Sequence, residues 1–181
     1  MDERMVARAQ AGDARALETL VRQYDRPMVR YFYRLSRDAE LAKDLRQELF
    51  CKLLSVLPRY DARRAKFKTW FYRLARNLAI DRIYRRRKPD TESLPENVSV
   101  SDSSEAPRQA AEIGEVRSAL LEALAGLPEV DRTIIALKHE TDLTFEEIGK
   151  TLGMPASTVK SRLYRSFETV RGDLVARGHN M

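Results

Sequence analysis

The stretch around which the chain is organised runs from Phe67 to Lys88 and has the sequence FKTWFYRLARNLAIDRIYRRRK. It contains Trp70, the single tryptophan of the protein, with four further aromatic residues and a basic run at its end. Aromatic rings offer flat faces to unstacked bases, and basic side chains offer charge to phosphates, which favours a surface for single-stranded or melting nucleic acid. The same pattern fits an amphipathic helix that buries Trp70, Phe71 and Leu74 and leaves a solvated basic face. The stretch alone leaves both interpretations open.

The positive charge of the protein is concentrated in its first half. The whole chain of 181 residues has a net charge of +6. Residues 1–90 carry +11, residues 91–116 carry −5, and residues 117–181 have nine basic and nine acidic side chains. A field of this kind attracts a polyanion to the first half, although a charge excess alone also fits a solvated surface.

The single cysteine, Cys51, excludes an intramolecular disulfide and fits a reducing compartment. The N-terminal residues lack the apolar run of a signal peptide, and no stretch approaches the roughly 20 apolar residues of a membrane span. We therefore expect a cytoplasmic protein that does not insert into a membrane.

Apolar residues recur with helical periodicity almost throughout, which predicts an all-α fold. In the first half we expect helices over 2–11, about 14–36 and about 38–57, with Asp13 and Asp38 as N-caps and Pro58 as a stop. Pro27 should bend or break the second of these helices. The stretch 67–88 should form two helical segments separated by a short break near Asn77.

The composition changes between Pro89 and Ala111, where proline, serine and acidic residues replace the apolar pattern. This predicts a flexible acidic linker over 89–111 between two small helical domains, 1–88 and 112–181. In the second domain the residues Val116, Leu120, Leu121 and Leu124 form one apolar stripe, which ends at Gly126 and Pro128.

The last part of the second domain has the spacing of a helix-turn-helix. Thr144 and Glu147 form a capping box, Gly153 supplies a tight turn, and Pro155 suits the start of a helix that runs to about Ala176. On that helix one face is apolar and should pack inward: Val159, Leu163, Phe167, Val170 and Leu174. Another face carries Ser157, Lys160, Ser161, Tyr164 and Arg165. Such donors suit the phosphates and base edges of a major groove, although a helical hairpin with a solvated face would show the same pattern.

Three blocks of sequence, in order, resemble the extracytoplasmic-function (ECF) group of bacterial RNA polymerase sigma factors. The first is Asp38 to Phe50. The second is Phe67-x-Thr69-Trp70-x-x-x-Leu74-Ala75-Arg76-Asn77-x-x-x-Asp81. The third comprises Leu127-Pro128-x-x-x-Arg132, Phe145-Glu146-Glu147-Ile148-Gly149 and Thr158-Val159-Lys160-Ser161-Arg162-Leu163-x-Arg165.

The resemblance implies a role for each block. Asp44, Gln47 and Glu48 would dock on the coiled coil of the largest polymerase subunit. The second block would recognise and melt the −10 element, and Asn77 would capture a flipped base; the candidate −10 residues are Lys68, Trp70, Arg73, Arg76, Asn77, Arg82, Arg85 and Arg86. The third block would bind the −35 duplex through Ser157, Thr158, Lys160, Ser161, Tyr164 and Arg165. The family usually has an anti-sigma factor as a further partner.

The sequence departs from the family pattern at three positions. Gly149 stands where alanine is usual, Phe167 where a basic residue is common, and Leu49 where valine or threonine is more usual. The change at Phe167 removes one expected phosphate contact.

Two other classes of function fit the sequence less well. A stand-alone helix-turn-helix repressor would not explain the helix at 38–50 or the Asn77 segment. A nuclease or nucleotidyl transferase needs clustered carboxylates or His and Cys ligands for metal, and the two histidines, His139 and His179, are far apart in sequence. We therefore expect no catalytic residue, no metal and no cofactor.

Overall fold

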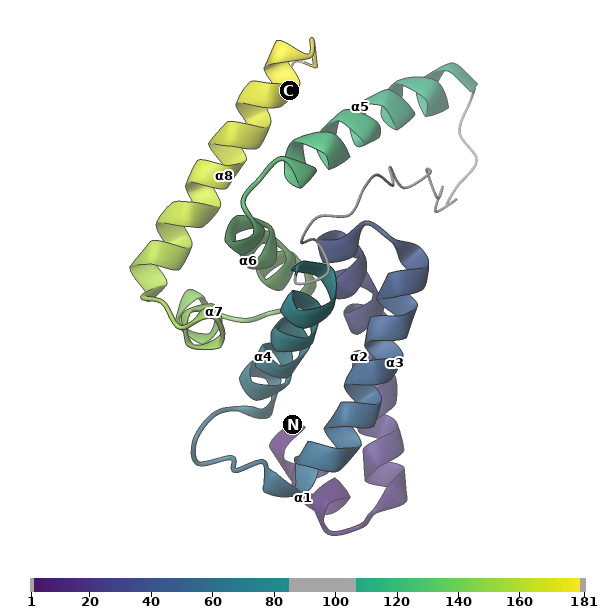
Figure 1. The fold of residues 1–181 in the computed structure, drawn as a ribbon, viewed down its shortest axis with the longest axis vertical. Coiled ribbons are helices and arrows are strands. Elements are labelled where there is room, and N and C mark those ends of the chain that lie inside the picture. Colours follow the sequence, from purple (N-terminus) through teal and green to yellow (C-terminus); the bar gives the residue numbers. More distant parts are fainter. Residues whose placement is uncertain (1, 85–106, 180–181) are drawn as a thin grey trace.

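The computed structural model describes residues 2–84 and 107–179. These residues form an all-helical structure with helices from both halves of the chain side by side (Figure 1). The segment 85–106, which contains Arg85, Arg86 and most of the expected linker, lies outside the described residues. The last five residues of that linker, 107–111, belong to a helix that begins at Pro107.

The first domain contains helices α1 (Asp2–Gln10), α2 (Ala14–Ser36), α3 (Ala39–Val56) and α4 (Phe67–Ala79). A 3-10 turn (Leu57–Arg59) follows α3, and a π-helical turn (Ile80–Tyr84) follows α4. The expected N-caps are confirmed: Asp13 accepts a hydrogen bond from the amide of Ala16, and Asp38 accepts one from Leu41. The sequence pattern therefore placed these helix starts correctly.

Helix α2 continues through Pro27, so the expected break is absent. Tyr24, Met28 and Tyr31 are buried on both sides of the proline. Because proline removes only one helical hydrogen bond, packing of this apolar face is sufficient to keep the helix continuous.

The break expected near Asn77 is also absent. Helix α4 includes Asn77 and ends two residues later, at Ala79, and the irregular backbone starts only at Ile80. Ala75, Leu78 and Ala79 are buried against the core, so tertiary packing outweighs the weak helix propensity of asparagine.

The core of the first domain is an aromatic cluster that joins α2 to α4. Tyr24 makes edge-to-face contacts with Phe67 and Phe71, with ring centroids 5.7 and 5.0 Å apart. The Tyr24 hydroxyl donates to Asp2 at 2.6 Å, which attaches α1 to the same cluster. The rings of Phe67, Phe71 and Tyr72 are fully buried, so these three rings are core residues and are not platforms for bases.

The second domain contains α5 (Pro107–Ala125), α6 (Glu129–Glu140), α7 (Phe145–Leu152) and α8 (Ala156–Ala176). The expected apolar stripe of α5 does not face the interior of this domain, because Val116 and Leu120 are exposed and the small residues Ala119 and Ala123 are buried. Helix α5 packs on α8. A face of small residues allows two helices to approach closely, which leaves the larger apolar residues of α5 on its outer side.

The helix-turn-helix is formed by α7 and α8 as expected. Thr144 and Glu147 form the complete capping box, and Gly153 ends α7 in the left-handed conformation with φ +71°. Position 149 also requires glycine, because a Cβ atom there would lie 2.6 Å from the carbonyl oxygen of Met154. The turn between the two helices is therefore packed against Gly149, at the position where the family usually has alanine.

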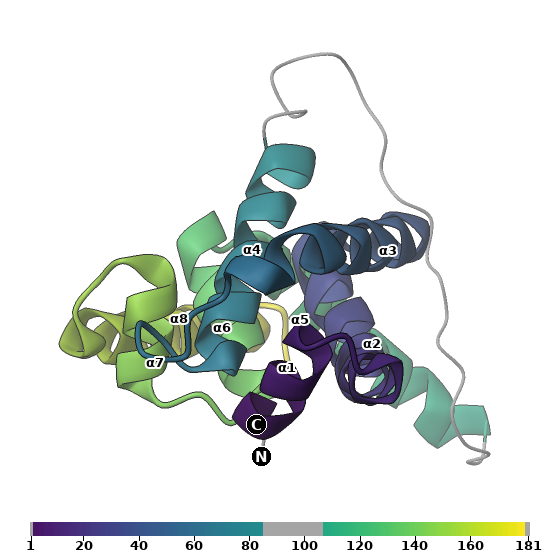
Figure 2. The ribbon, with the colours of Figure 1, turned by 90° about the horizontal axis from the view of Figure 1, so that it is seen from below.

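The two domains pack against each other in this structure. Helix α6 lies on α2, and α7 lies on α4. Figure 2 shows α4 between α7 on one side and α2 and α3 on the other.

We predict that Gly149→Ala destabilises the protein by about 1–2 kcal/mol, because overpacking of a backbone carbonyl outweighs the gain of up to about 1 kcal/mol in helix propensity. The matched control is Gly172→Ala in α8, where an added Cβ meets nothing within 4 Å. The control should stabilise the protein by about 0.5–1 kcal/mol. Urea unfolding of the full chain measures both, and equal stabilisation by the two substitutions would contradict the steric argument.

Candidate polymerase and nucleic-acid interfaces

The acidic face of α3 is formed as the spacing predicts. Asp44 and Gln47 are exposed, and Glu48 is partly buried beside them. The Glu48 carboxylate accepts two hydrogen bonds from Arg82, at 2.9 Å from Nε and 2.6 Å from Nη2. This ion pair connects the candidate polymerase-binding face to the candidate −10 segment.

The candidate −10 residues that lie within the described chain differ in their accessibility. Arg73 and Asn77 are exposed, whereas Lys68, Arg76 and Arg82 are partly buried. Trp70 is partly buried against Tyr60 and Phe67, with ring centroids 5.0 and 5.8 Å away. The amphipathic interpretation is confirmed for Phe71, which is buried, while Trp70 and Leu74 are partly buried. The outer surface with Arg73 and Asn77 fits either interpretation, so its role in binding nucleic acid stays a prediction.

The polar face of α8 is presented to solvent. Val159, Leu163, Ser166 and Val170 are buried on one side of the helix, while Lys160, Ser161, Tyr164 and Arg165 are exposed on another. The expectation that Phe167 packs inward is wrong, because its side chain is exposed and the small Ser166 beside it is buried instead. Ser157 is also exposed, and Thr158 is partly buried. The Ser161 hydroxyl donates to the Thr158 carbonyl at 3.1 Å. The face begins in the first turn of a long helix, the part of a recognition helix that contacts bases.

Two arginines of the family motif connect helices of the second domain. Arg162 of α8 forms an ion pair with Asp131 of α6 at 2.8 Å, and Arg132 of α6 donates to the carbonyl of Ala125 at the end of α5 at 3.2 Å. The first contact attaches α8 to α6, so Arg162 points away from the exposed polar face, and the second attaches α6 to α5.

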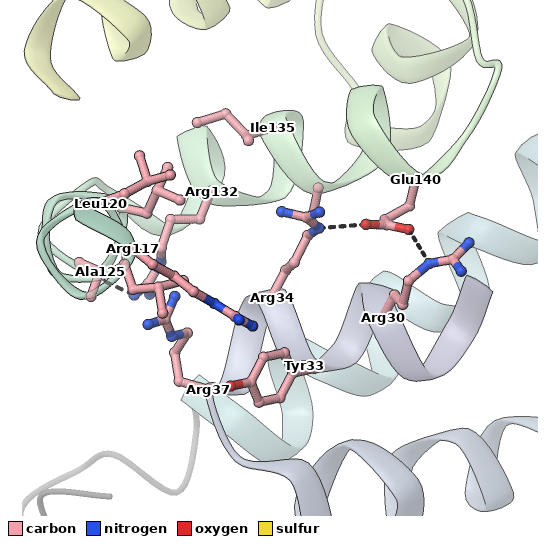
Figure 3. A pocket seen from close by; sticks show the side chains of 13 residues that line it. Arg30, Tyr33, Arg34, Arg37, Arg117, Leu120, Ala125, Arg132, Ile135 and Glu140 are labelled. Atoms are coloured by element: carbon pink, nitrogen blue, oxygen red, sulfur yellow. Dashed lines mark hydrogen bonds and ion pairs between the residues drawn. The ribbon is translucent and has the colours of Figure 1, made fainter. Parts of the chain in front are cut away.

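The contact between the domains contains charged residues that the sequence did not single out. Glu140, at the end of α6, forms ion pairs with Arg30 and Arg34 of α2 (Figure 3). Lys66 pairs with Glu147 at 2.7 Å, and Lys68 pairs with Asp142 at 3.2 Å. The spacing of Arg30 and Arg34 at i and i+4 indicated a shared face, but nothing in the sequence indicated Glu140 as their partner.

Two of these carboxylates are held in their charged form. Burial acts to raise the pKa of Glu140, but the hydrogen bonds from Arg30 and Arg34 hold its pKa below the usual value. The Lys66 ammonium and the Thr144 amide lower the pKa of Glu147. Both glutamates therefore stay ionised at neutral pH in this arrangement of the domains.

A cavity of about 350 Å³ lies between α2, α5 and α6. Its apolar lining includes Leu120, Leu121 and Leu124 from the outward-facing stripe of α5, together with Ile135 of α6. Arginines surround it: Arg30, Arg34, Arg37, Arg117 and Arg132 (Figure 3). Burial lowers the pKa of the Arg37 guanidinium, and the like charges of Arg132 and Arg34 lower it further. Glu140 also lines the cavity and pairs with Arg30 and Arg34, so the cavity is apolar inside and has an excess of positive charge at its rim.

Two family models match the chain: Sigma-70 region 2 over residues 20–88 and Sigma-70, region 4 over residues 117–170. The chain is 32% identical to the ECF RNA polymerase sigma factor SigW of Bacillus subtilis strain 168, over 96% of this chain and 97% of the relative. It is 31% identical to the RNA polymerase sigma-H factor of Pseudomonas aeruginosa, over 93% and 91% of the two chains.

Two solved structures share the fold. A complex of CnrH with the cytosolic domain of CnrY matches with a TM-score of 0.72 at 21% identity, over 97% of both chains. A complex of the sigma factor RpoE with the anti-sigma factor NepR from Bartonella quintana matches with a TM-score of 0.62 at 20% identity, over 82% of this chain and 90% of that chain.

Regions 2 and 4 in this order define a sigma-70 family protein, which is a non-enzymatic class. Within that family, the chain belongs to the ECF sigma factors. None of its described helices has the length and apolar character that crossing a membrane requires.

The position of Asn77 inside α4 changes what a substitution there should do. A residue in the last turn of a helix is not an N-cap, so Asn77→Ala should keep or slightly raise stability, by about 0.5 kcal/mol, through better helix propensity. If Asn77 contacts a flipped base, Asn77→Ala and Asn77→Ser should both weaken binding of holoenzyme to a single-stranded −10 oligonucleotide, with the loss concentrated at one base.

The measurement is the affinity of the holoenzyme for oligonucleotides with each base at each −10 position. The control is Arg73→Ala, one helical turn earlier and equally exposed, which should weaken all sequences alike if it contacts phosphate. A loss spread evenly over all positions for the Asn77 variants would contradict the base contact.

Proposed function

We propose that this chain binds core RNA polymerase through the acidic face of α3 and directs it to promoters by binding the −35 duplex with α8 and melted −10 bases with the outer face of α4. The observation that carries the proposal is the exposed polar face of α8, supported by a complete capping box and a tight turn on a family-matched region 4. The work is done by binding free energy, without a chemical step in this chain.

Promoter opening follows from the two kinds of contact. Binding at the −35 duplex fixes the register of the protein on the DNA. Unstacking a −10 base costs a few kcal/mol, which stacking and hydrogen bonds in a base pocket offset. We propose that Asn77 contacts the unstacked base and that Arg73, Arg76 and Arg82 contact the DNA backbone. Lys68 and Trp70, at the start of the same helix, complete the −10 surface.

Each part of the chain has one role in this proposal: the domains are 1–88 and 112–181, and the segment between them is 89–111. We propose that the segment tethers a polymerase-binding, −10-reading domain to a −35-reading domain. The protein acts where polymerase and promoter are, in the cytoplasm.

We further propose an anti-sigma factor as a partner, docked in the cavity between α2, α5 and α6. An amphipathic helix with acidic residues beside an apolar face would match the leucines inside the cavity and the arginines around it. Burial of the outward-facing leucines of α5 would remove apolar surface from water.

Polymerase docking should fail when the charge of the α3 face is reversed. Asp44→Arg is the sharpest variant, because it leaves the Glu48–Arg82 ion pair intact. It places a cation against a basic partner and should reduce co-elution with core polymerase at least tenfold, with the circular dichroism unchanged. The matched control is Glu18→Arg, at an exposed position of α2, and this variant should co-elute normally. Normal co-elution of the Asp44→Arg protein would remove this face from the polymerase contact.

Two substitutions on α8 should distinguish a side chain that contacts a −35 base from one that contacts a phosphate. Arg165→Ala should cost about 1–3 kcal/mol and relax preference at one base pair. Lys160→Ala should weaken all sequences alike and reduce the salt slope by about one unit. Footprinting of holoenzyme on promoter variants at several salt concentrations measures both effects, with Lys43→Ala on α3 as a control for charge loss. Equal losses on every promoter variant would remove Arg165 as a base contact.

A further inference from the structure

The contact between the two domains is electrostatically complementary. Among the described residues, Arg30, Arg34, Lys66 and Lys68 of the first domain form ion pairs with Glu140, Glu147 and Asp142 of the second. The excess positive charge of the first half of the chain thus faces acidic side chains of region 4. Since opposite charges on two tethered domains attract, this arrangement favours their association.

These ion pairs differ in what they contribute. The Asp142 carboxylate is fully exposed, and Lys66 is largely exposed, so solvent and salt screen both lysine pairs. The Glu140 side chain is only 4% exposed, and two guanidinium groups contact it from α2, with Arg30 Nε at 2.6 Å. Arg34 also lies 3.1 Å from Nδ1 of His139. Glu140 is therefore the charged group on which the contact depends most.

The packed arrangement cannot bind both promoter elements at once. The −35 and −10 elements are about 25 base pairs apart, which is roughly 85 Å along a duplex. In this structure the helix that would read the −10 bases, α4, packs directly on α7, the first helix of the helix-turn-helix. Simultaneous contact with both elements thus requires the two domains to separate.

We propose that Glu140, clamped by Arg30 and Arg34, is an intramolecular latch that holds the sigma factor in a closed, promoter-incompetent state without any other protein. This inference rests on the proposed function. The latch opposes simultaneous recognition of the two promoter elements and leaves single binding surfaces accessible, because Asp44 and Gln47 on α3 and the polar face of α8 are exposed in the closed state. Polymerase and promoter must therefore bind the separated domains tightly enough to offset the free energy of the latch.

The closed state can be measured directly by energy transfer within the full-length chain. The native Cys51 is exposed on α3, and Val175 is exposed in the last turn of α8, so Val175→Cys gives a pair of dye sites, one on each domain. The wild-type background gives the transfer efficiency of the closed arrangement, and we expect this efficiency to fall when the domains separate. Glu140→Gln should reduce the ratio of closed to open molecules about tenfold, because both arginines lose their charged acceptor.

Two further variants separate the latch from a general loss of stability. Arg30→Gln with Arg34→Gln removes the other side of the latch at partly exposed positions and should open the protein as much as Glu140→Gln. The matched control is Asp131→Asn, which removes a partly buried acid from the Arg162 ion pair within the second domain and should leave the transfer efficiency at its wild-type value. Unchanged transfer in both latch variants would overturn the proposal, as would equal opening in the Asp131→Asn control.

The inhibitory role is tested by transcription with a limiting amount of sigma factor. Latch variants should reach half-maximal transcription at about three- to tenfold lower concentration than wild type, on a promoter with both elements. Lower transfer efficiency with an unchanged half-maximal concentration would overturn the inhibitory role. Absence of transcription from every variant and from wild type would overturn the proposed function and the inhibitory role with it, while the energy-transfer result would still decide whether the closed contact exists.

Discussion

The packing of α4 against Tyr24 is the interaction on which the rest of the structure depends. Tyr24 contacts Phe67 and Phe71 edge-on and holds α1 through Asp2, so three helices converge on one ring. Because a helix repeats every 3.6 residues, fixing the aromatic face of α4 inward also fixes Arg73 and Asn77 outward. The same packing puts one side of α4 within reach of α7. A single cluster therefore sets the core, the candidate base-contacting surface and the place where the second domain docks.

Region 4 depends on a different constraint, which is steric. The turn before α8 needs the positive φ of Gly153, and its backbone lies against Gly149. With the turn fixed, Val159 and Leu163 are buried, and Lys160, Ser161 and Arg165 necessarily point to solvent. The local signals for this motif are short-range, which is why the capping box, the turn and the helix limits could all be predicted from the sequence.

The features that sequence reasoning missed all involve tertiary packing. Local rules for Pro27 and Asn77 indicated interruptions, but burial of neighbouring apolar residues keeps both helices continuous. The stripe of α5 has helical periodicity, which establishes that its residues share a face but not which face is inside; the small residues Ala119 and Ala123 pack against α8 instead. Pairing of Glu140 with Arg30 and Arg34 joins positions more than 100 residues apart, and no local pattern encodes such a contact. The proposed roles of α3 and α8 come from the family resemblance of the blocks at 38–50 and 158–165 and not from local physical rules.

The latch and the cavity share residues, and this couples regulation by a partner to the shape of the chain. Arg30, Arg34 and Glu140 line the cavity and also form the contact between the domains. A helix bound there would contact α2 from one domain and α5 and α6 from the other, so it would bind the closed state and not the open one. By mass action such a ligand multiplies the ratio of closed to open molecules by 1 + L/Kd, where L is its free concentration. The intrinsic latch lowers the affinity that an inhibitor needs, because part of the free energy of closure is already supplied within the chain.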